Sequence, residues 1–274
     1  MTNQTAITFS AGYQAICGIL LREFGVDPSE ANALIFQYKV EKYMEKHRLS
    51  SAEECVGYIL EDKSRLLDLS DHIYSQSTHF NRHPEHFRFM VETSLREGRR
   101  EKASPENPLR VWSLACSSGQ EAYTIAFNLM EHLFPEPESW SSLKVEGADC
   151  SRLSLETARK AVYSREDVER LSPLPYHKYF EEAGPDHLAV LPQVREKVDF
   201  DFFNLVEPIY PYLAQMDYVF LRNALDFHTS HSRTAVLSKV RMTLKRGGYL
   251  ILGDCPDALA YGYEEAAPGC LRAI

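Results

Sequence analysis

The sequence predicts an α/β protein whose mostly parallel sheet is covered by helices on both faces and is preceded by a small all-helical domain. Two observations predict this class. Apolar, strand-like runs recur from residue 109 onward with helical periodicity between several of them, whereas no strand signal precedes that residue. Strands that alternate with helices are typical of such sheets. With 274 residues, the chain is long enough for one large and one small domain.

Residues 9–74 carry the signals of short helices. Apolar side chains recur at helical spacing over residues 13–24, and Gly25 follows as a stop signal. Residues 27–30, Asp-Pro-Ser-Glu, combine an N-cap, a proline at the first helical position and an acidic first turn, so a second helix is predicted to begin there. Ser and Glu at the two ends of residues 51–54 predict a capping box for a third helix.

A polar stretch over residues 96–108, which contains two prolines, separates this helical part from the strand-like runs. We therefore predict a helical domain over residues 1–92 and an α/β domain over residues 93–274. Strands are predicted at 109–114, 143–148, 198–203, 216–221 and 249–252, and helices at 121–133, 154–162 and 230–244.

The composition excludes several classes of protein. The formal net charge of -9 leaves no excess of Lys and Arg to neutralise a phosphate backbone, so no nucleic acid partner is predicted. Neither a leader-like N-terminus nor an apolar run of about 18 residues is present, which predicts a cytoplasmic protein without membrane insertion. His79, His83 and His86 lie close together, but Pro84 interrupts the helical register and the six cysteines lack metal-ligand spacing, so we predict no metal site.

Unusual residues follow two of the predicted strands, at the ends where open parallel sheets bind their ligands. Residues 115–121, ACSSGQE, place small side chains at the start of a helix, where backbone can approach a ligand closely. Asp149 follows the second strand, where a carboxylate can accept the hydroxyls of a ribose. The alternatives are a tight turn for the loop and a helix N-cap for Asp149.

Together, and in this order along the chain, the loop and the carboxylate favour a nucleotide-like cofactor. The loop lacks the full G-x-G-x-x-G set of glycines, which leaves room for a cofactor without a pyrophosphate. S-adenosylmethionine is such a cofactor.

Seven segments of the chain match, in order and at similar spacing, the motifs of one family. The segment "STHFNRHPEHF" resembles T-x-F-F-R, and "VWSLACSSGQEAYTIA" resembles W-S-x-x-C-S-x-G-E-E-x-Y-S-I-A. The segment "ADCSRLSLETARKAVY" is similar to T-D-I-D-x-x-x-L-x-x-A-x-x-G-x-Y, and the series continues through "LSPLPYHKYF", "VDFDFFNL", "MDYVFLRNALDF" and "LKRGGYLILGD". The family is that of the CheR-type chemotaxis receptor methyltransferases, which transfer a methyl group from S-adenosylmethionine to glutamate side chains.

The resemblance implies a Rossmann-like class I methyltransferase sheet with a short β-insert at about residues 180–200. It also implies the residues at the methyl end of the cofactor. Thr78 and Arg82 would reach the amino-acid end of the cofactor and the methyl group, where a guanidinium can form two parallel hydrogen bonds to a carboxylate. Gln76 stands at the position of the family's Asn, and Phe227 at that of a Tyr near the methyl group. Arg82 and Phe227 are therefore the candidate catalytic residues.

The remaining roles implied by the resemblance belong to residues that follow the strand ends. They are Ala115 and Glu121 for the methionine portion, Asp149 for the ribose, Asn204 and Leu205 for the adenine, and Arg222 and Asn223 for further cofactor contacts.

Three residues depart from the family pattern: Asn81 replaces a Phe, Ser151 replaces an acidic residue, and Phe227 replaces the Tyr. They leave open a second interpretation, a module that binds S-adenosylmethionine or S-adenosylhomocysteine and signals with little or no catalysis. The partner implied by the resemblance is the cytoplasmic domain of a chemoreceptor. Because the insert is short, we expect no tether to a receptor's C-terminal peptide.

Overall fold

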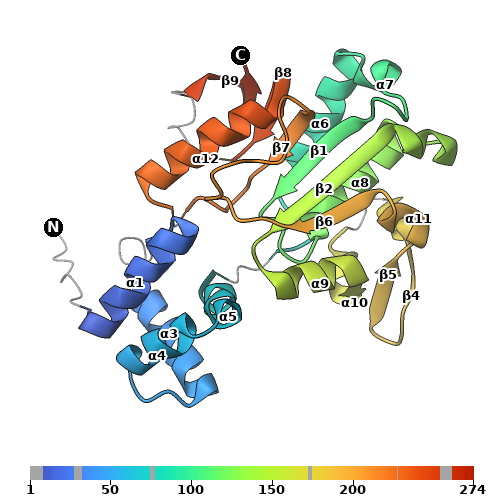
Figure 1. The fold of residues 1–274 in the computed structure, drawn as a ribbon. Coiled ribbons are helices and arrows are strands. Elements are labelled where there is room, and N and C mark those ends of the chain that lie inside the picture. The colour runs from blue at the N-terminus through green and yellow to red at the C-terminus, as the bar shows by residue number, and fades with distance from the viewer. Residues whose placement is uncertain (1–8, 28–32, 75–77, 172–174, 227, 254–260) are drawn as a thin grey trace, which may run out of the picture. The chain divides into compact units, whose positions relative to one another are not determined.

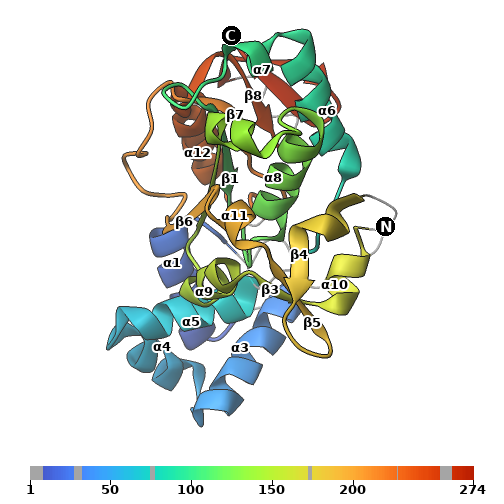
Figure 2. The ribbon, with the colours of Figure 1, turned by 90° about the vertical axis from the view of Figure 1, so that its right-hand side faces the viewer.

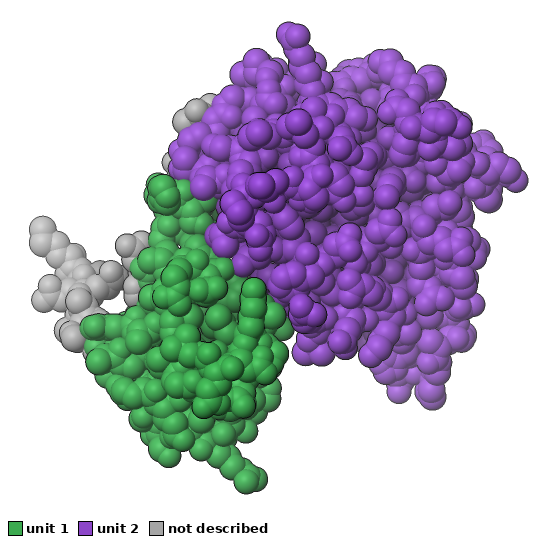
Figure 3. Space-filling model, in the orientation of Figure 1, with its two compact units in different colours: residues 1–76, 225–233 green, residues 77–224, 234–274 purple. Residues whose placement is uncertain are grey.

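The computed structural model of the chain describes residues 9–27, 33–74, 78–171, 175–226, 228–253 and 261–274. By their internal contacts the residues form two compact units, one of residues 1–76 with 225–233 and one of residues 77–224 with 234–274 (Figure 3). The described residues 78–92 thus belong to the unit that contains the sheet. The domain boundary at residue 92 stays a prediction.

Helices build the first unit. They are α1 (Ala11–Phe24), α3 (Ala33–His47), α4 (Ala52–Leu60) and α5 (Lys63–Tyr74) (Figure 1). The predicted stop after α1 is confirmed, because Gly25 adopts a left-handed φ of 73° and its N–H bonds the Leu21 carbonyl. The predicted cap of α4 is confirmed as well, since the Ser51 hydroxyl accepts the Glu54 N–H at 3.1 Å. The start predicted for the second helix falls largely on residues 28–30, outside the described residues.

A seven-stranded sheet forms the centre of the second unit, in the order β6-β2-β1-β7-β8-β10-β9. Its strands are β1 (Leu109–Leu114), β2 (Leu143–Asp149), β6 (Val198–Phe202), β7 (Met216–Phe220), β8 (Leu244–Ile251), β9 (Tyr263–Ala267) and β10 (Cys270–Ala273). Pairing is parallel from β6 to β8, whereas β10 is antiparallel to both of its neighbours. The predicted α/β class and the five predicted strands are confirmed, although β8 begins already at Leu244.

Helices cover both faces of this sheet (Figure 2). One face carries α6 (Pro84–Arg96), α8 (Gln120–His132) and α9 (Arg152–Lys160), and the other carries α12 (Ser230–Thr243). Shorter helical segments are α7 (Arg99–Lys102), α10 (Arg165–Glu169), α11 (Pro192–Arg195) and the 3₁₀-helices η1 (Pro137–Ser142) and η2 (Pro175–Tyr179). The apolar side of α8 is almost wholly buried, which places the core between this helix and the sheet.

A second, three-stranded antiparallel sheet has the order β3-β5-β4. It consists of β3 (Val162–Ser164), β4 (Phe180–Glu182) and β5 (His187–Val190). Two of its strands lie within the region of the expected β-insert, and the third precedes that region.

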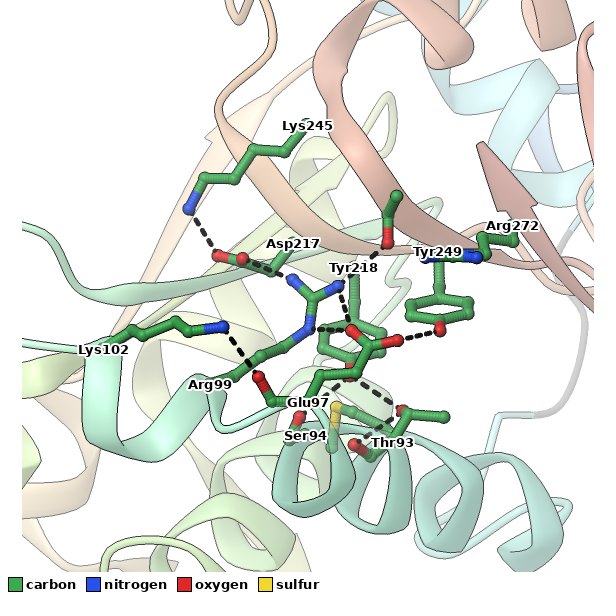
Figure 4. A network of polar contacts seen from close by, with 12 residues as sticks. Thr93, Ser94, Glu97, Arg99, Lys102, Asp217, Tyr218, Lys245, Tyr249 and Arg272 are labelled. Carbon is green, nitrogen blue, oxygen red and sulfur yellow. Dashed lines mark hydrogen bonds and ion pairs between the residues drawn. The ribbon is translucent and has the colours of Figure 1, made fainter. Parts of the chain in front are cut away.

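The polar stretch of residues 96–108 contributes to a half-buried charge network and is not a plain connection (Figure 4). The Arg99 guanidinium pairs with Asp217 on β7 and with Glu97, both at 2.7 Å. The Tyr249 hydroxyl donates to Glu97, and Lys245 pairs with Asp217 at 2.8 Å. The network therefore fixes the end of α6 against β7 and β8.

Among the described residues no helix combines the length and apolar character needed to cross a bilayer.

Candidate active site

Several of the sequence-predicted site residues lie at the carboxyl ends of the parallel strands. Strand order reverses direction between β1 and β7, and sheets of this kind bind their ligands in the crevice at that switch point. Ala115 follows β1, Asp149 ends β2, Asn204 and Leu205 follow β6, and Arg222 and Asn223 follow β7. Glu121 lies in the first turn of α8.

The loop between β1 and α8 is shaped by three residues with positive φ: Ala115 at 55°, Ser117 at 50° and Gly119 at 93°. Gly119 is required by the chain's own packing, because a Cβ there would lie 2.8 Å from the Cβ of Ala158 and 3.1 Å from the Phe200 ring. The absence of a side chain at Gly119 thus has an internal reason. Close approach of a ligand to the remainder of the loop stays a prediction.

Asp149 holds this loop in place. Its Oδ2 accepts the Ser117 N–H at 2.8 Å, and its Oδ1 accepts the Ser151 N–H at 2.8 Å. Burial raises the pKa of the Asp149 carboxyl, and the backbone N–H groups of Ser151, Ser117 and Cys150 oppose this rise. The N-cap of α9 is Ser151, whose hydroxyl accepts the Ser154 N–H. The alternative of Asp149 as the helix cap is therefore wrong.

Glu121 and Arg222 form a buried ion pair across the switch point. The Arg222 Nε donates to Glu121 Oε2 at 2.6 Å, and the Ser113 hydroxyl donates to Glu121 Oε1 at 2.6 Å. The side chains of Arg222 and Glu121 are only 5% and 11% exposed. Two residues predicted to contact the cofactor thus also bind each other, and both carboxylate oxygens of Glu121 already accept a hydrogen bond.

Arg222 also reaches the segment that precedes α6. Its Nη1 donates to the Arg82 carbonyl at 2.5 Å and lies 3.5 Å from Nδ1 of His86, while the guanidinium stands 4.9 Å from the centroid of the Phe87 ring. Burial and the Arg222 charge lower the pKa of His86 to about 4, so its imidazole is neutral near pH 7. Sequence reasoning considered His86 only as a metal ligand and missed this contact.

The segment around Arg82 has an unusual backbone. Asn81 and His83 have positive φ values of 55° and 59°, and the Asn81 N–H donates to the Thr124 hydroxyl at 3.2 Å. Asparagine adopts this conformation more readily than phenylalanine, which gives a structural reason for the departure at this position. Thr78 and Arg82 are half-buried. Gln76 and Phe227, the other residues predicted at the methyl end, lie outside the described residues.

The three histidines of this segment have different surroundings. His79 Nδ1 lies 2.9 Å from the Phe80 carbonyl, His83 pairs with Glu85, and His86 faces Arg222. Across the described part of the chain, no group of three His, Cys, Asp or Glu side chains is arranged to hold a metal ion.

The pair predicted to flank the adenine lies next to Asp149. The Phe203 N–H donates to the Asp149 carbonyl at 3.0 Å, which extends the β2–β6 pairing into the loop. The Asn204 Oδ1 then accepts the Val206 N–H at 3.2 Å, and its carbonyl accepts the Glu207 N–H, so the chain turns there. The loops predicted to bind ribose and base are thereby joined by a backbone hydrogen bond.

A comparison with known families agrees with this geometry. The model of the CheR methyltransferase, S-adenosylmethionine-binding domain matches residues 76–260, more than half of the chain. The chain belongs to this family. The match includes the segment before α6, the sheet from β1 to β8 and all predicted site residues, and the chain accordingly is a methyltransferase with S-adenosylmethionine as its cofactor.

Curated relatives resemble the chain over nearly its full length. It is 31% identical to chemotaxis protein methyltransferase Cher2 of Pseudomonas putida, covering 96% of this chain and 95% of the relative. It is 30% identical to chemotaxis protein methyltransferase 1 of Pseudomonas aeruginosa, with the same coverage. Chemotaxis protein methyltransferase 1 of Vibrio cholerae is 28% identical and covers 91% of this chain. The similarity therefore includes the helical first unit.

The residues at the switch point fit S-adenosylmethionine. A carboxylate offers about four acceptor sites, so Asp149, with its three backbone partners, can still accept a ribose hydroxyl. The left-handed residues of the loop after β1 present main chain instead of long side chains at the adjoining edge. Asp149 and the loop 115–119 would therefore hold the nucleoside, with the Asn204 turn beside them.

Proposed function

We propose that this protein transfers the methyl group of S-adenosylmethionine to glutamate side-chain carboxylates of a chemoreceptor-like protein. Family membership supports the reaction, and the names of the relatives support a chemotaxis substrate. The observation that carries the proposal is that Asp149, Glu121 and the Arg82 segment, each implied by the family's motifs, are linked at one end of the sheet by Ser117 and Arg222.

The chemistry asks mainly for positioning. When bound, S-adenosylmethionine supplies a methyl group on a positively charged sulfur: an oxygen of the acceptor carboxylate bonds the methyl carbon as the carbon–sulfur bond breaks, which leaves the neutral thioether of S-adenosylhomocysteine. No protein base is needed, because a glutamate is ionised near pH 7. Arg82 would orient the acceptor carboxylate or the cofactor's own carboxylate, while Asp149 would fix the ribose. The buried Arg222 would hold the Arg82 backbone in place.

The finer description of the partner is part of this proposal. We place the enzyme in the cytoplasm, with the cytoplasmic domain of a chemoreceptor as its substrate. Recognition would proceed without a clamp on the receptor's C-terminal peptide, because the edge strands of the small sheet, β3 and β4, contain only three residues each and offer a short edge for pairing. Receptor domains with and without their last residues should therefore be methylated equally well.

A single-turnover reaction with methyl-labelled S-adenosylmethionine and purified receptor domains tests the function. Label should appear in the receptor and should be released as methanol in mild alkali, because a carboxyl ester is alkali-labile and a methylated amine is not. Tight binding of the cofactor without any transfer would instead support the non-catalytic module. Alkali-stable label would exclude a carboxylate acceptor.

The role of Arg82 is tested by Arg82→Ala, which should lower the rate of transfer by about 10²-fold, the effect typical of losing one charge that orients or stabilises the reacting groups. Arg88→Ala is the matched control, since Arg88 follows Arg82 by six residues and lies exposed on α6. Equal turnover by the two variants would contradict the assignment of Arg82.

A further inference from the structure

Lys239 on α12 makes an unusual set of contacts to the loop that follows β6. Its Nζ donates to the Leu205 carbonyl at 3.1 Å and to the Glu207 carbonyl at 2.6 Å. It also stands 4.9 Å from the centroid of the Tyr210 ring, within the range of a cation–π contact. One ammonium group thus ties two carbonyls of the short Asn204–Glu207 turn to α12, which lies on the face of the sheet opposite α8.

Tyr210 holds one of the same two carbonyls, that of Leu205. Its hydroxyl donates to the Leu205 carbonyl at 2.8 Å, so this carbonyl accepts two hydrogen bonds. The Tyr210 ring packs edge-on against the rings of Phe203 and of Trp112 on β1, with distances between ring centroids of 4.8 Å and 5.9 Å. Burial raises the pKa of Tyr210, so the hydroxyl remains a donor at neutral pH.

The carbonyl held in this way belongs to one of the two residues predicted to flank the adenine. The preceding residue, Asn204, uses its side-chain oxygen to form the turn, and Phe203 is bonded to the Asp149 carbonyl. The turn is therefore fixed at its start by β2 and at its end by α12. Beside the Tyr210 hydroxyl on the Leu205 carbonyl, the Lys239 ammonium group thus ties the Leu205 and Glu207 carbonyls to α12.

We infer that Lys239 is a positioning residue for the base of the cofactor: its ammonium group fixes the Asn204–Glu207 turn so that the turn can receive the adenine ring. The inference rests on the proposed function, in which this turn is the base-binding element. Partial burial lowers the pKa of Lys239, and Glu207 opposes that shift. Preorganising a loop in its bound form raises affinity because less conformational entropy is lost on binding.

Calorimetry with S-adenosylhomocysteine tests the inference without any acceptor protein. Lys239→Met removes the ammonium group but keeps the length of the side chain, and it should weaken binding about 10-fold. Lys239→Arg keeps the charge and the donors and should restore most of the affinity. Arg241→Met is the matched control, because Arg241 lies on the same helix but bonds the Gly262 carbonyl, and it should bind within 2-fold of the wild type.

Tyr210→Phe gives a milder second test, since it removes only the other donor to the Leu205 carbonyl; a 2-fold to 3-fold loss of affinity is expected. In turnover assays, Lys239→Met should raise the KM for S-adenosylmethionine about 10-fold and change kcat less than 2-fold. Equal affinity of Lys239→Met and Arg241→Met for S-adenosylhomocysteine would overturn the inference. A 10-fold fall in the kcat of Lys239→Met with its KM unchanged would overturn it as well. A wild type that binds but transfers nothing would contradict the proposed function alone.

Discussion

Replacing Arg222 with methionine would leave the Glu121 carboxylate without its guanidinium partner in a site that solvent hardly reaches. The two side chains are 5% and 11% exposed and meet at 2.6 Å. Removing one partner of a buried ion pair destabilises a protein by about 3–5 kcal/mol, because the other charge stays buried and uncompensated. We expect Arg222→Met to lower the free energy of unfolding of the second unit by this amount.

Tryptophan fluorescence isolates that unit, because both tryptophans of the chain, Trp112 and Trp140, belong to it. A domain of 150–250 residues loses about 2–4 °C in Tm for each kcal/mol, so the expected fall in Tm is about 6–20 °C. Arg272→Met is the matched control. Its partner Glu264 and Arg272 itself are about half exposed, and a pair of this kind contributes about 1 kcal/mol or less.

The double variant Glu121→Gln with Arg222→Met separates the ion pair from other effects of Arg222. Glutamine can keep the hydrogen bond from Ser113 but has no charge to leave unpaired. The double variant should therefore recover at least about 2 kcal/mol relative to the sum of the single variants, within the range of coupling for residues in contact. A coupling energy below about 0.5 kcal/mol would refute the buried pair as the tie across the switch point.

Other parts of the site yield further expectations. Asp149→Ala should weaken S-adenosylhomocysteine binding by about 1.5–3 kcal/mol, the contribution of charge-assisted hydrogen bonds; an unchanged calorimetric affinity would remove its role. Gly119→Ala should destabilise the protein by about 2–5 kcal/mol, because the residue has a positive φ and its Cβ would overlap with Ala158. Gly18→Ala, whose Cβ would point into open space on α1, should not destabilise the protein. Similar melting curves of the two variants would contradict this expectation. The pKa of His86 falls from its usual 6.5 to about 4, so only the unfolded chain takes up this proton between pH 6.5 and about 4. The free energy of unfolding should therefore fall by about 3 kcal/mol as pH decreases through that window, and the fall should be smaller in His86→Gln; the same slope in both proteins would rule out His86 as its source.

Local patterns in the sequence predicted most of the sheet. Strand β1 coincides with its predicted range, and β2, β6 and β7 differ by a residue at one end. The central strands β1 and β7 are buried almost throughout and read as largely apolar runs, whereas the edge strand β6 alternates apolar and acidic residues over Val198–Phe202; both patterns are visible without neighbours. The hairpin of β9 and β10 was missed. Its first strand exposes Glu264 and Glu265, so it has no such run and is identified only by its pairing with β10.

The site shows the same division. The positions of Asp149 and of the small-residue loop at strand ends could be read from the sequence, and the family's motifs added Arg82, Glu121 and Arg222. What these groups bond could not be read, because Glu121 and Arg222 are separated by 101 residues and Arg99 and Asp217 by 118. Sequence periodicity reports only on neighbours within a few residues.

The sequence by itself therefore determined the five parallel strands of the large sheet, several of its helices and the chemical groups that follow the strand ends. Only the tertiary structure decided that the end of β1 adjoins the end of β7, that Arg222 is thereby buried against Glu121, and that Lys239 reaches the turn after β6. The physical reason is that burial favours apolar residues at each position of a strand or helix, so it can be read from neighbouring residues. The partner of a charged group depends instead on strand order and helix placement, which are properties of the packed chain as a whole.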